Sequence, residues 1–339
     1  MTDVTLIGLD LAKNVFQAHG VDAEGTRVWS RRLRRDGVGA FFARQPRGVV
    51  AMEACAGAHH WGRLLEKMGH EVRLIPAREV KPFVRLPKTD VSDAAAIAEA
   101  ARRPQLRRVP VKSEACQAIC AAHRARDQLM RRRTSLINAL RAHLAEFGIT
   151  APAGEAGRTR LFEQVRGREM AALPELLCLA LQGLLEAIEA LERSIAAIER
   201  GLSAAAGADA AARRLQAVPG IGRLTASALV AFASDARRFE SARQFVAWLG
   251  LAPRVEASGG RTRIGGITKS GPEYLRRLLV HGARSRLRGK AGARDPWFDG
   301  LLARRPRAVA ITALAAKQAR IAWALMVREE AYRPRLVAT

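Results

Sequence analysis

The sequence has 339 residues, of which 49% are apolar, so it is long enough to bury more than one hydrophobic core. Its 57 Lys and Arg residues outnumber its 32 Asp and Glu residues, and the net charge of +25 predicts a polyanionic partner such as nucleic acid. No charged segment followed by an apolar run opens the sequence, and no apolar stretch reaches the ~18 residues of a membrane span. We therefore expect a soluble cytoplasmic protein with no membrane partner, whose four scattered cysteines form no disulfide framework and lie buried or half-buried.

The first 110 residues have the pattern of a mixed α/β sheet. Short apolar or β-branched runs predict five strands, at residues 3–10, 14–21, 26–33, 48–53 and 71–76. The first three are expected to form an antiparallel meander, with a tight turn between the second and the third. A helix is predicted at 59–68, between the last two strands, and strands that alternate with helices indicate a mixed sheet.

Four carboxylates are expected at one edge of this sheet. Asp10 and Glu53 end two of the predicted strands, and Asp90 and Asp93 precede an Ala-rich helical segment at 94–102. By themselves, the two aspartates are better explained as part of a helix N-terminus, and the other two acids as strand ends near solvent. Together at the carboxyl ends of strands, the four would repel one another unless a divalent cation lay between them. We therefore predict a site for Mg²⁺, or Mn²⁺, that acts on a phosphodiester.

Two long helices are predicted in the middle of the chain. One spans residues 113–147, and the other contains apolar residues spaced alternately four and three apart between 177 and 202, the pattern of a coiled-coil seam. The seam must be buried against the 113–147 helix or against another subunit, and both alternatives remain open. The basic run 131–133 is either a solvated face or a track for a phosphate backbone. Small residues at 203–212 predict a linker.

The stretch Val218 to Gly222 lies between two helical patterns and resembles a helix-hairpin-helix motif. Glycines in such a turn accept the left-handed backbone conformation and let N–H groups approach a phosphate. Gly220 and Gly222 are therefore candidate DNA contacts, although a plain helical turn explains the stretch equally well.

Residues 253–271 form the second chemically distinctive segment, expected as a loop that contains five glycines and places Ser258 directly before a Gly pair. The segment and the helix that follows it carry five predicted phosphate-binding cations, Arg254, Arg261, Arg263, Lys269 and Arg276. A serine in such a cradle could attack phosphorus. No His or Asp lies beside Ser258 to act as its base, so the segment alone is better explained as a flexible basic loop.

In combination, these motifs resemble the transposases of the insertion sequence 110 family. The matching motifs are Asp10 in Gly-Leu-Asp, Glu53 in Met-Glu-Ala-Cys, Lys-Thr-Asp-x-x-Asp at 88–93, and Ser258 in Ala-Ser-Gly-Gly. The likeness covers nearly the whole chain, with no departure at the five motif positions. It implies an RNase H-like (RuvC-like) α/β domain at 1–110, a helical coiled-coil region at 111–206, and a mostly α C-terminal domain at 207–339 with the helix-hairpin-helix-like element.

The resemblance also implies chemistry and partners. Ser258 would form a covalent phosphoserine link to DNA, and Asp10, Glu53, Asp90 and Asp93 with their Mg²⁺ would assist the attack. A structured guide RNA would bridge donor and target DNA, in a dimer or tetramer of the chain. Nucleic acid would be contacted by eight residues: Lys88, Gly220, Gly222, Arg254, Arg261, Arg263, Lys269 and Arg276.

Two other classes of protein fit parts of the sequence. A metal-dependent junction nuclease would use the four carboxylates with water as the nucleophile, and it would release free DNA ends. A non-catalytic nucleic-acid-binding protein would need only the charge and the helix-hairpin-helix-like turn. A tyrosine recombinase is disfavoured because the sequence has two tyrosines, and Tyr274 precedes the nearby Arg276, Arg277 and His281 instead of following them.

Overall fold

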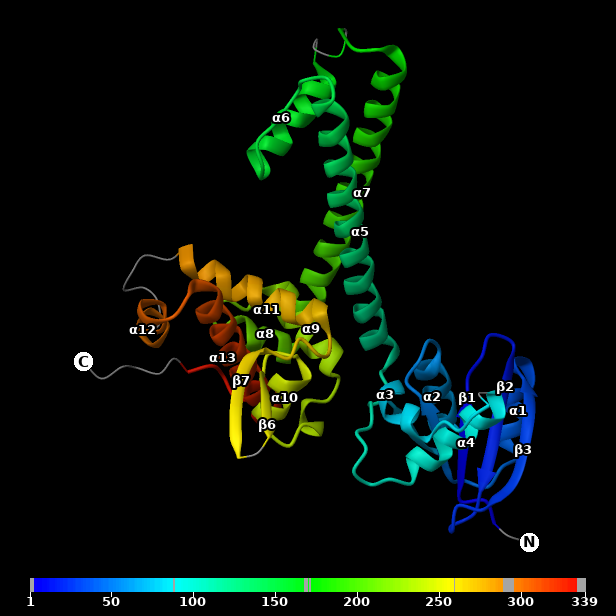
Figure 1. Ribbon diagram of the computed structural model, residues 1–339. Coiled ribbons are helices and arrows are strands. Elements are labelled where there is room, and N and C mark those ends of the chain that lie inside the picture. Colours follow the sequence, from blue (N-terminus) through cyan, green and yellow to red (C-terminus); the bar gives the residue numbers. More distant parts are fainter. Residues whose placement is uncertain are drawn as a thin grey trace. The chain divides into compact units, whose positions relative to one another are not determined.

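The computed structural model describes residues 3–87, 89–167, 170, 172–258, 260–288 and 296–333 (Figure 1). The chain divides into two compact units, Met1–Glu114 and Ala115–Thr339. Buried apolar residues form separate clusters in each unit, so each unit has its own hydrophobic core.

The first unit is built on one five-stranded sheet with the order β3-β2-β1-β4-β5. Its strands are β1 (Leu6–Asp10), β2 (Val15–Val21), β3 (Arg27–Arg34), β4 (Val49–Glu53) and β5 (Glu71–Ile75). β1, β2 and β3 pair antiparallel, whereas β4 is parallel to both β1 and β5. The predicted meander and the predicted mixed α/β sheet are therefore confirmed, and β3 is an edge strand.

Helices cover both faces of this sheet. On one face, apolar residues of β1 and β2 pack against α1 (Val38–Ala43) and α2 (Ala58–Lys67). On the other face, Leu6, Val21 and Ala51 pack against α4 (Asp90–Ala101). The remaining helical turns of the unit are η1 (Arg35–Gly37), α3 (Ala77–Val80) and η2 (Lys81–Phe83). Alternate residues of a strand therefore belong to the α4 face or to the α1/α2 face.

Close approach of α4 to the sheet depends on Gly8. A Cβ atom at Gly8 would lie 2.3 Å from the carbonyl oxygen of Ala94 and 2.7 Å from the backbone nitrogen of Ala98. Backbone atoms cannot yield to such a clash. The small side chains of β1 and α4 therefore set the distance between the helix that carries Asp90 and Asp93 and the strand that carries Asp10.

Gly8→Ala is expected to lower the free energy of unfolding of the first unit by about 2–4 kcal/mol, because the added methyl group forces α4 away from β1. Gly39→Ala in α1 is the matched control, since its Cβ would meet only the Met68 side chain at 3.8 Å. Urea unfolding of the two variants measures the difference. Equal midpoints would show that α4 does not depend on Gly8.

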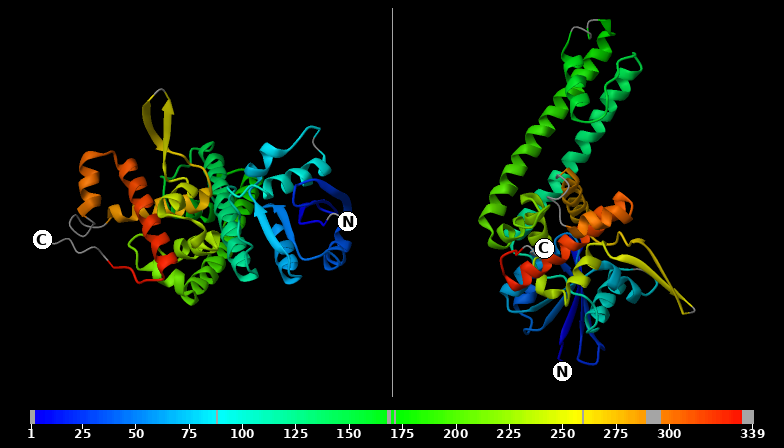
Figure 2. Two further views of the ribbon diagram at one scale, coloured as in Figure 1. Left: turned by 90° about the horizontal axis from the view of Figure 1, so that it is seen from below. Right: turned by 90° about the vertical axis from the view of Figure 1, so that its left-hand side faces the viewer.

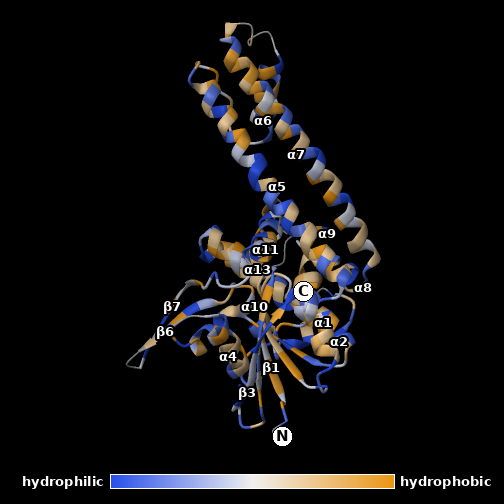
Figure 3. Cartoon of the chain, turned by 90° about the vertical axis from the view of Figure 1, so that its right-hand side faces the viewer, coloured by the Kyte–Doolittle hydropathy of each residue, from blue (hydrophilic) through white to orange (hydrophobic). Residues whose placement is uncertain are grey.

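The second unit begins with a long antiparallel helical hairpin. α5 (Glu114–Ala145) and α7 (Glu175–Ala208) are linked by α6 (Glu155–Arg166), and apolar residues of all three helices share one cluster. Ion pairs join Arg126 to Glu199 and Arg133 to Glu192, so the two long helices run in opposite directions. Polar and apolar residues alternate along both helices (Figure 3). The seam of α7 is therefore buried, at least in part, within the chain itself.

One prediction for this region is wrong. Residues 203–212 are not a linker, because α7 continues to Ala208 and α8 (Ala210–Gln216) begins after Asp209 alone. Alanine has the highest helix propensity, so a run of alanines favours helix over an extended linker. Asp209 interrupts the run by capping α8, where its side chain accepts a hydrogen bond from the backbone of Ala212 at 2.7 Å.

Helices α8 to α13 form the rest of the second unit. They are α9 (Arg223–Ala233), α10 (Ala242–Trp248), α11 (Glu273–Ser285), α12 (Pro296–Arg304) and α13 (Arg307–Arg328), with the short turns η4 (Ala236–Arg238) and η5 (Arg286–Arg288). Leu229, Phe245, Leu279 and Ala319 lie in their common core. One described helix, α13, is long and apolar enough to cross a membrane, and half of the relevant window is buried in the unit.

Candidate functional site

Two carboxylates lie at the same level of the sheet in the first unit. Asp10 ends β1 and Glu53 ends β4, the parallel neighbour of β1. Leu9 pairs with Met52, which places Asp10 and Glu53 next in register. Both belong to the α4 face, because Leu6, Gly8 and Asp10 alternate with residues of the opposite core. The predicted juxtaposition of these two strand ends is therefore found in the fold.

The other two carboxylates lie in the first turn of α4. The N-cap of this helix is Thr89, whose side chain accepts from the backbone of Ser92 at 3.1 Å. In turn, the hydroxyl of Ser92 accepts a hydrogen bond from the backbone N–H of Thr89 at 2.8 Å, and the two bonds together form a capping box. Neither Asp90 nor Asp93 is the capping residue. Thr89 and Ser92 therefore cap the start of α4, and the two aspartates are not needed for this purpose.

The four carboxylates interact electrostatically around Asp10. The pKa of the Asp10 carboxyl is raised from 3.8 to about 6, first by burial and then by the negative charges of Asp93, Asp90 and Glu53. The thiol of Cys55, an exposed residue, has its pKa raised by partial burial and by Glu53 and Asp10. Cys55 is therefore a neighbour of the acids that the sequence did not indicate, and the expectation that it is buried is wrong.

The acids are not drawn together as a formed metal site. Among the residues that the structure describes, no group of three His, Cys, Asp or Glu side chains is arranged to hold a metal ion. Asp93 and Glu53 are half-buried, whereas Asp90 is exposed. Lys88, the predicted nucleic-acid contact directly before Thr89, lies outside the described residues.

The predicted glycine-rich loop is a β-hairpin in the second unit. β6 (Pro253–Ser258) pairs antiparallel with β7 (Arg261–Ile267), and Ser258 is the last residue of β6, opposite Arg261. Two features explain the difference: alternating residues such as Val255 and Ile264 favour strands, and Gly260 has a left-handed φ of +73° at the turn. The hairpin projects from the helices of its unit (Figure 2).

The predicted phosphate-binding cations fall into two groups. Arg254, Arg261 and Arg263 are exposed on the hairpin, and Arg263 pairs across the strands with Glu256. Exposed Lys269 has a left-handed φ of +57°, and its backbone N–H donates to Gly250. Arg276 is half-buried and makes contacts that support the hairpin. Its Nη1 donates to the carbonyl oxygens of Leu249 and Ser270, at 3.2 Å each, at the base of the hairpin.

The helix-hairpin-helix-like turn joins α8 to α9. Gly220 has φ +93°, and a Cβ there would lie 2.2 Å from Nε2 of Gln318 and 2.9 Å from the carbonyl oxygen of Gly282. Close packing with α11 and α13 thus requires glycine at this position. Gly222, by contrast, is the exposed N-cap of α9 with no atom near its would-be Cβ. Gly222 is exposed and Gly220 is partly exposed, so both stay predicted phosphate contacts.

Three arginines of α5, Arg126, Arg131 and Arg133, form ion pairs within the second unit. Arg131 pairs with Asp127 and Glu273, and Arg133 pairs with Glu192. The basic run 131–133 therefore has two of its three charges compensated by carboxylates distant in the sequence. Such pairing favours a structural role for the run over a phosphate track.

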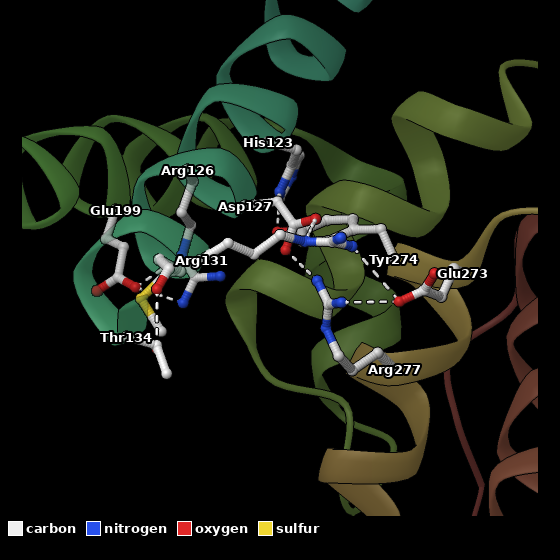
Figure 4. Close-up of polar contacts among 10 residues, drawn as sticks. His123, Arg126, Asp127, Arg131, Thr134, Glu199, Glu273, Tyr274 and Arg277 are labelled. Carbon is white, nitrogen blue, oxygen red and sulfur yellow. Dashed lines mark hydrogen bonds and ion pairs between the residues drawn. The ribbon is translucent and has the colours of Figure 1, made fainter. Parts of the chain in front are cut away.

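A polar network connects α11, the helix after the hairpin, to α5 (Figure 4), and one further contact of His123 reaches α9. His123 of α5 is fully buried, with Nδ1 3.0 Å from the hydroxyl of Tyr274 and Nε2 3.2 Å from the hydroxyl of Ser227. Beside it, Arg277 forms an ion pair with Asp127. The sequence offered no signal for this network, because its members lie more than 100 residues apart.

His123→Gln is expected to weaken the dependence of stability on pH. Burial, and then the charge of Arg126, lowers the pKa of His123 from 6.5 to about 4. Between these values the unfolded chain binds a proton that the folded chain excludes, so stability is lost as pH falls through the window, by about 2–4 kcal/mol. His143→Gln, at an exposed position of the same helix, is the control. Urea unfolding at pH 7 and at pH 4 measures the loss of stability between these two pH values. This loss should be smaller than in the parent protein for His123→Gln and unchanged for His143→Gln.

Known proteins resemble the chain over both units. Residues 7–149 match a family profile of DEDD transposases, and residues 212–297 match the profile described as "Transposase IS116/IS110/IS902 family". A "Probable family 20 transposase" of Pseudomonas aeruginosa is 49% identical over 98% of this chain and 99% of its own length. The chain belongs to the IS110 family of transposases.

Two further relatives of this transposase are also named as transposases. The transposase for insertion sequence element IS1328 of Yersinia enterocolitica is 41% identical, over 95% of this chain and 97% of the relative. The transposase for IS1111A of Coxiella burnetii is 38% identical, over 98% and 92%. The predicted family, and with it DNA as a partner, is therefore confirmed. The four acids lie in the first matched segment, and Ser258 lies in the second.

Proposed function

We propose that this transposase cuts and rejoins DNA at the ends of its mobile element by metal-assisted attack of Ser258. The observation that carries the proposal is the placement of four acids. Asp10 and Glu53 end neighbouring strands on the face that α4 covers, and Asp90 and Asp93 lie in the first turn of α4. The charges of the other three acids help to raise the pKa of Asp10. Four carboxylates that repel one another on a phosphodiester-cleaving enzyme are suited to a hard divalent cation. Their mutual destabilisation would be relieved by the ion.

Asp10, Glu53, Asp90 and Asp93 would hold Mg²⁺ or Mn²⁺. Their donor chemistry fits, because carboxylate oxygens are the preferred ligands of both ions. The bound ion would supply charge stabilisation at the phosphorus centre and at the leaving oxygen. The half-buried positions of Asp10 and Glu53 would exclude part of the surrounding water, and α4 would hold Asp90 and Asp93 against them.

Ser258 would act as the nucleophile. Its Oγ would lose a proton and form a bond to phosphorus, while the bond from phosphorus to a deoxyribose oxygen breaks and that oxygen takes up a proton. The phosphoserine link conserves the energy of the phosphodiester, so the strand can be joined to a new end without another energy source. Support comes from the place of Ser258 at the end of β6 and from the exposed Arg261 and Arg263 on β7.

The proposal includes two partners besides DNA. A structured guide RNA would bridge donor and target DNA, and the transposase would act as a dimer or tetramer in the cytoplasm, on the nucleoid. Support comes from membership of the family and from the net charge of +25, which suits a large polyanionic assembly. The two long helices of the second unit offer a half-buried line, Leu184, Leu191 and Ile198, that another subunit could cover.

Tyr274 is poorly suited to replace Ser258. Its hydroxyl lies 3.0 Å from Nδ1 of buried His123, and burial raises its pKa. A tyrosine nucleophile must lose its proton to attack, so a raised pKa disfavours this role. The surroundings of Tyr274 therefore agree with the sequence order in disfavouring a tyrosine recombinase.

The test separates the transposase chemistry from a simple nuclease. A plasmid that carries the element end is incubated with the protein and with the transcript of the element's non-coding region, in MgCl₂ or EDTA. We expect cut strands with protein attached in MgCl₂, and uncut plasmid in EDTA. Free DNA ends without attached protein would support the junction nuclease, and cutting in EDTA would contradict the metal assignment.

A further inference from the structure

A row of polar residues crosses the sheet of the first unit at the level of Asp10. Asp10 pairs with Gln17 of β2, and Gln17 pairs with Arg32 of β3. On the other side of β1, Glu53 is next in register. Cross-strand partners lie on the same face of a sheet, so Arg32, Gln17, Asp10 and Glu53 share the α4 face. The sheet therefore places a guanidinium group two strands from the acidic cluster.

The α4 face of β3 is open. α4 packs on β1 and β2, where Leu6 and Val21 join its alanines in one core cluster. On β3, the residues of this face are Ser30, Arg32 and Arg34, and both arginines are exposed. Leu33, between the two arginines, belongs to the opposite core. The exposed arginines are thus presented next to α4 and on the side of the sheet where Asp10 lies.

Local contacts hold this strand but leave its charge available. Gln17 is only 4% exposed, and its Nε2 donates to the hydroxyl of Ser30 at 2.8 Å, which ties β3 to β2 beside Asp10. Within the described part of the chain, no carboxylate pairs with Arg32. Arg34 makes one exposed ion pair, with Asp36 at 3.6 Å, and such pairs contribute little stability. This differs from α5, where Arg131 and Arg133 are paired with carboxylates.

A hollow lies at the end of β3, on the side of α2. It has a volume of about 790 Å³, and its lining includes Arg34, Arg35, Asp36, His60 and Trp61. Arg35 lies over the rings of Phe16 and Trp61, with its guanidinium carbon 5.7 Å and 5.4 Å from the ring centres. Two arginines and one aspartate line the hollow, so its net charge is positive and favours an anion.

We propose that the α4 face of β3, through Arg32 and Arg34, binds the phosphate backbone of the DNA strand that the acidic cluster acts on. Adjacent strands are about 4.8 Å apart, so Arg32 lies roughly 10 Å from Asp10 across the sheet, or about three nucleotides of rise along a duplex. Guanidinium groups bind phosphate oxygens without reading the base, so this contact positions the strand. The assignment rests on the proposed function only in naming the strand that the acids process.

The test compares two doubly substituted proteins with the same change of charge. Arg32→Ala with Arg34→Ala removes the α4-face arginines, and Arg31→Ala with Arg44→Ala removes two exposed arginines from the α1/α2 face. Affinity of the full chain for a duplex DNA is measured by fluorescence anisotropy in EDTA over a range of NaCl. We expect the first variant to bind about tenfold or more weakly, with a salt slope smaller by about two, and the control to change much less.

Binding in EDTA does not depend on cleavage, so this result stands whether or not Ser258 and the acids prove catalytic. Urea unfolding checks that both variants fold like the parent. Equal loss of affinity in the two variants would overturn the proposal in favour of a general charge effect. Unchanged DNA affinity would show that the arginines only protect an edge strand. Weaker binding of an RNA hairpin alone would assign the face to RNA and would also overturn the proposal.

Discussion

Ser258→Ala is expected to eliminate the covalent protein–DNA adduct and to lower strand cleavage about a thousandfold or more, because alanine has no oxygen to attack phosphorus. Binding of DNA should remain, since the exposed cations of the hairpin are unchanged. The adduct is measured by denaturing electrophoresis of labelled DNA after the reaction with guide RNA and MgCl₂. A shifted band should form with the parent protein and not with Ser258→Ala.

Thr262→Ala is the matched control for this experiment. Thr262 lies in the same hairpin and carries a hydroxyl, but it pairs with Ala257, one position away from the Ser258–Arg261 pair in the register. The control should form the adduct at a rate near that of the parent. An adduct of normal yield with Ser258→Ala would show that another residue is the nucleophile, and loss in both variants would indicate a damaged hairpin.

Asp10→Asn is expected to abolish cleavage and, at the same time, to stabilise the metal-free protein at pH 7. The pKa of Asp10 in the folded protein is about 6, against 3.8 for an ordinary aspartate. Between these values the folded state holds a proton that the unfolded state releases, so stability falls as pH rises through the window. After allowance for its partial exposure to solvent, the ionised carboxylate costs about 1–2 kcal/mol at pH 7, and asparagine removes that cost.

The measurement is urea unfolding in EDTA at pH 7 and at pH 4, with Glu24→Gln, at an exposed turn, as the control. The gain from Asp10→Asn should be present at pH 7 and should disappear at pH 4, where Asp10 is protonated in the folded protein. MgCl₂ at pH 7 should stabilise the parent protein more than the variant, because an ion bound to the folded state alone adds to its stability. Retained cleavage, or equal stability at pH 7, would contradict the assignment of Asp10.

Local pattern predicted the elements well where the preference of the segment and its tertiary environment agree. The alternation and β-branching of the first five runs indicated the strands of the sheet, and Asp10 and Glu53 were correctly placed at strand ends. The long helix α5 was expected within one or two residues of its bounds. In each case the deciding factor is local, a short apolar period or a terminating residue.

The errors have local explanations as well. Residues 203–212 were expected as a linker because they are small, yet alanine favours helix. Residues 253–271 were expected as a loop because they contain five glycines, yet most of the segment pairs as β6 and β7. At the start of α4, Thr89 rather than an aspartate forms the cap. Composition alone was misleading in the first two, where specific pairing or propensity decided the conformation.

The sequence by itself determined the family and which strands end on carboxylates, because these depend on residue order and short periods. Only the tertiary structure decided which side chains are neighbours. The strand order β3-β2-β1-β4-β5 brings Arg32 level with Asp10, and the pairing of α5 with α7 and α11 neutralises Arg131 and Arg133. These contacts join residues far apart in the chain, so they follow from register and packing, which no local pattern specifies.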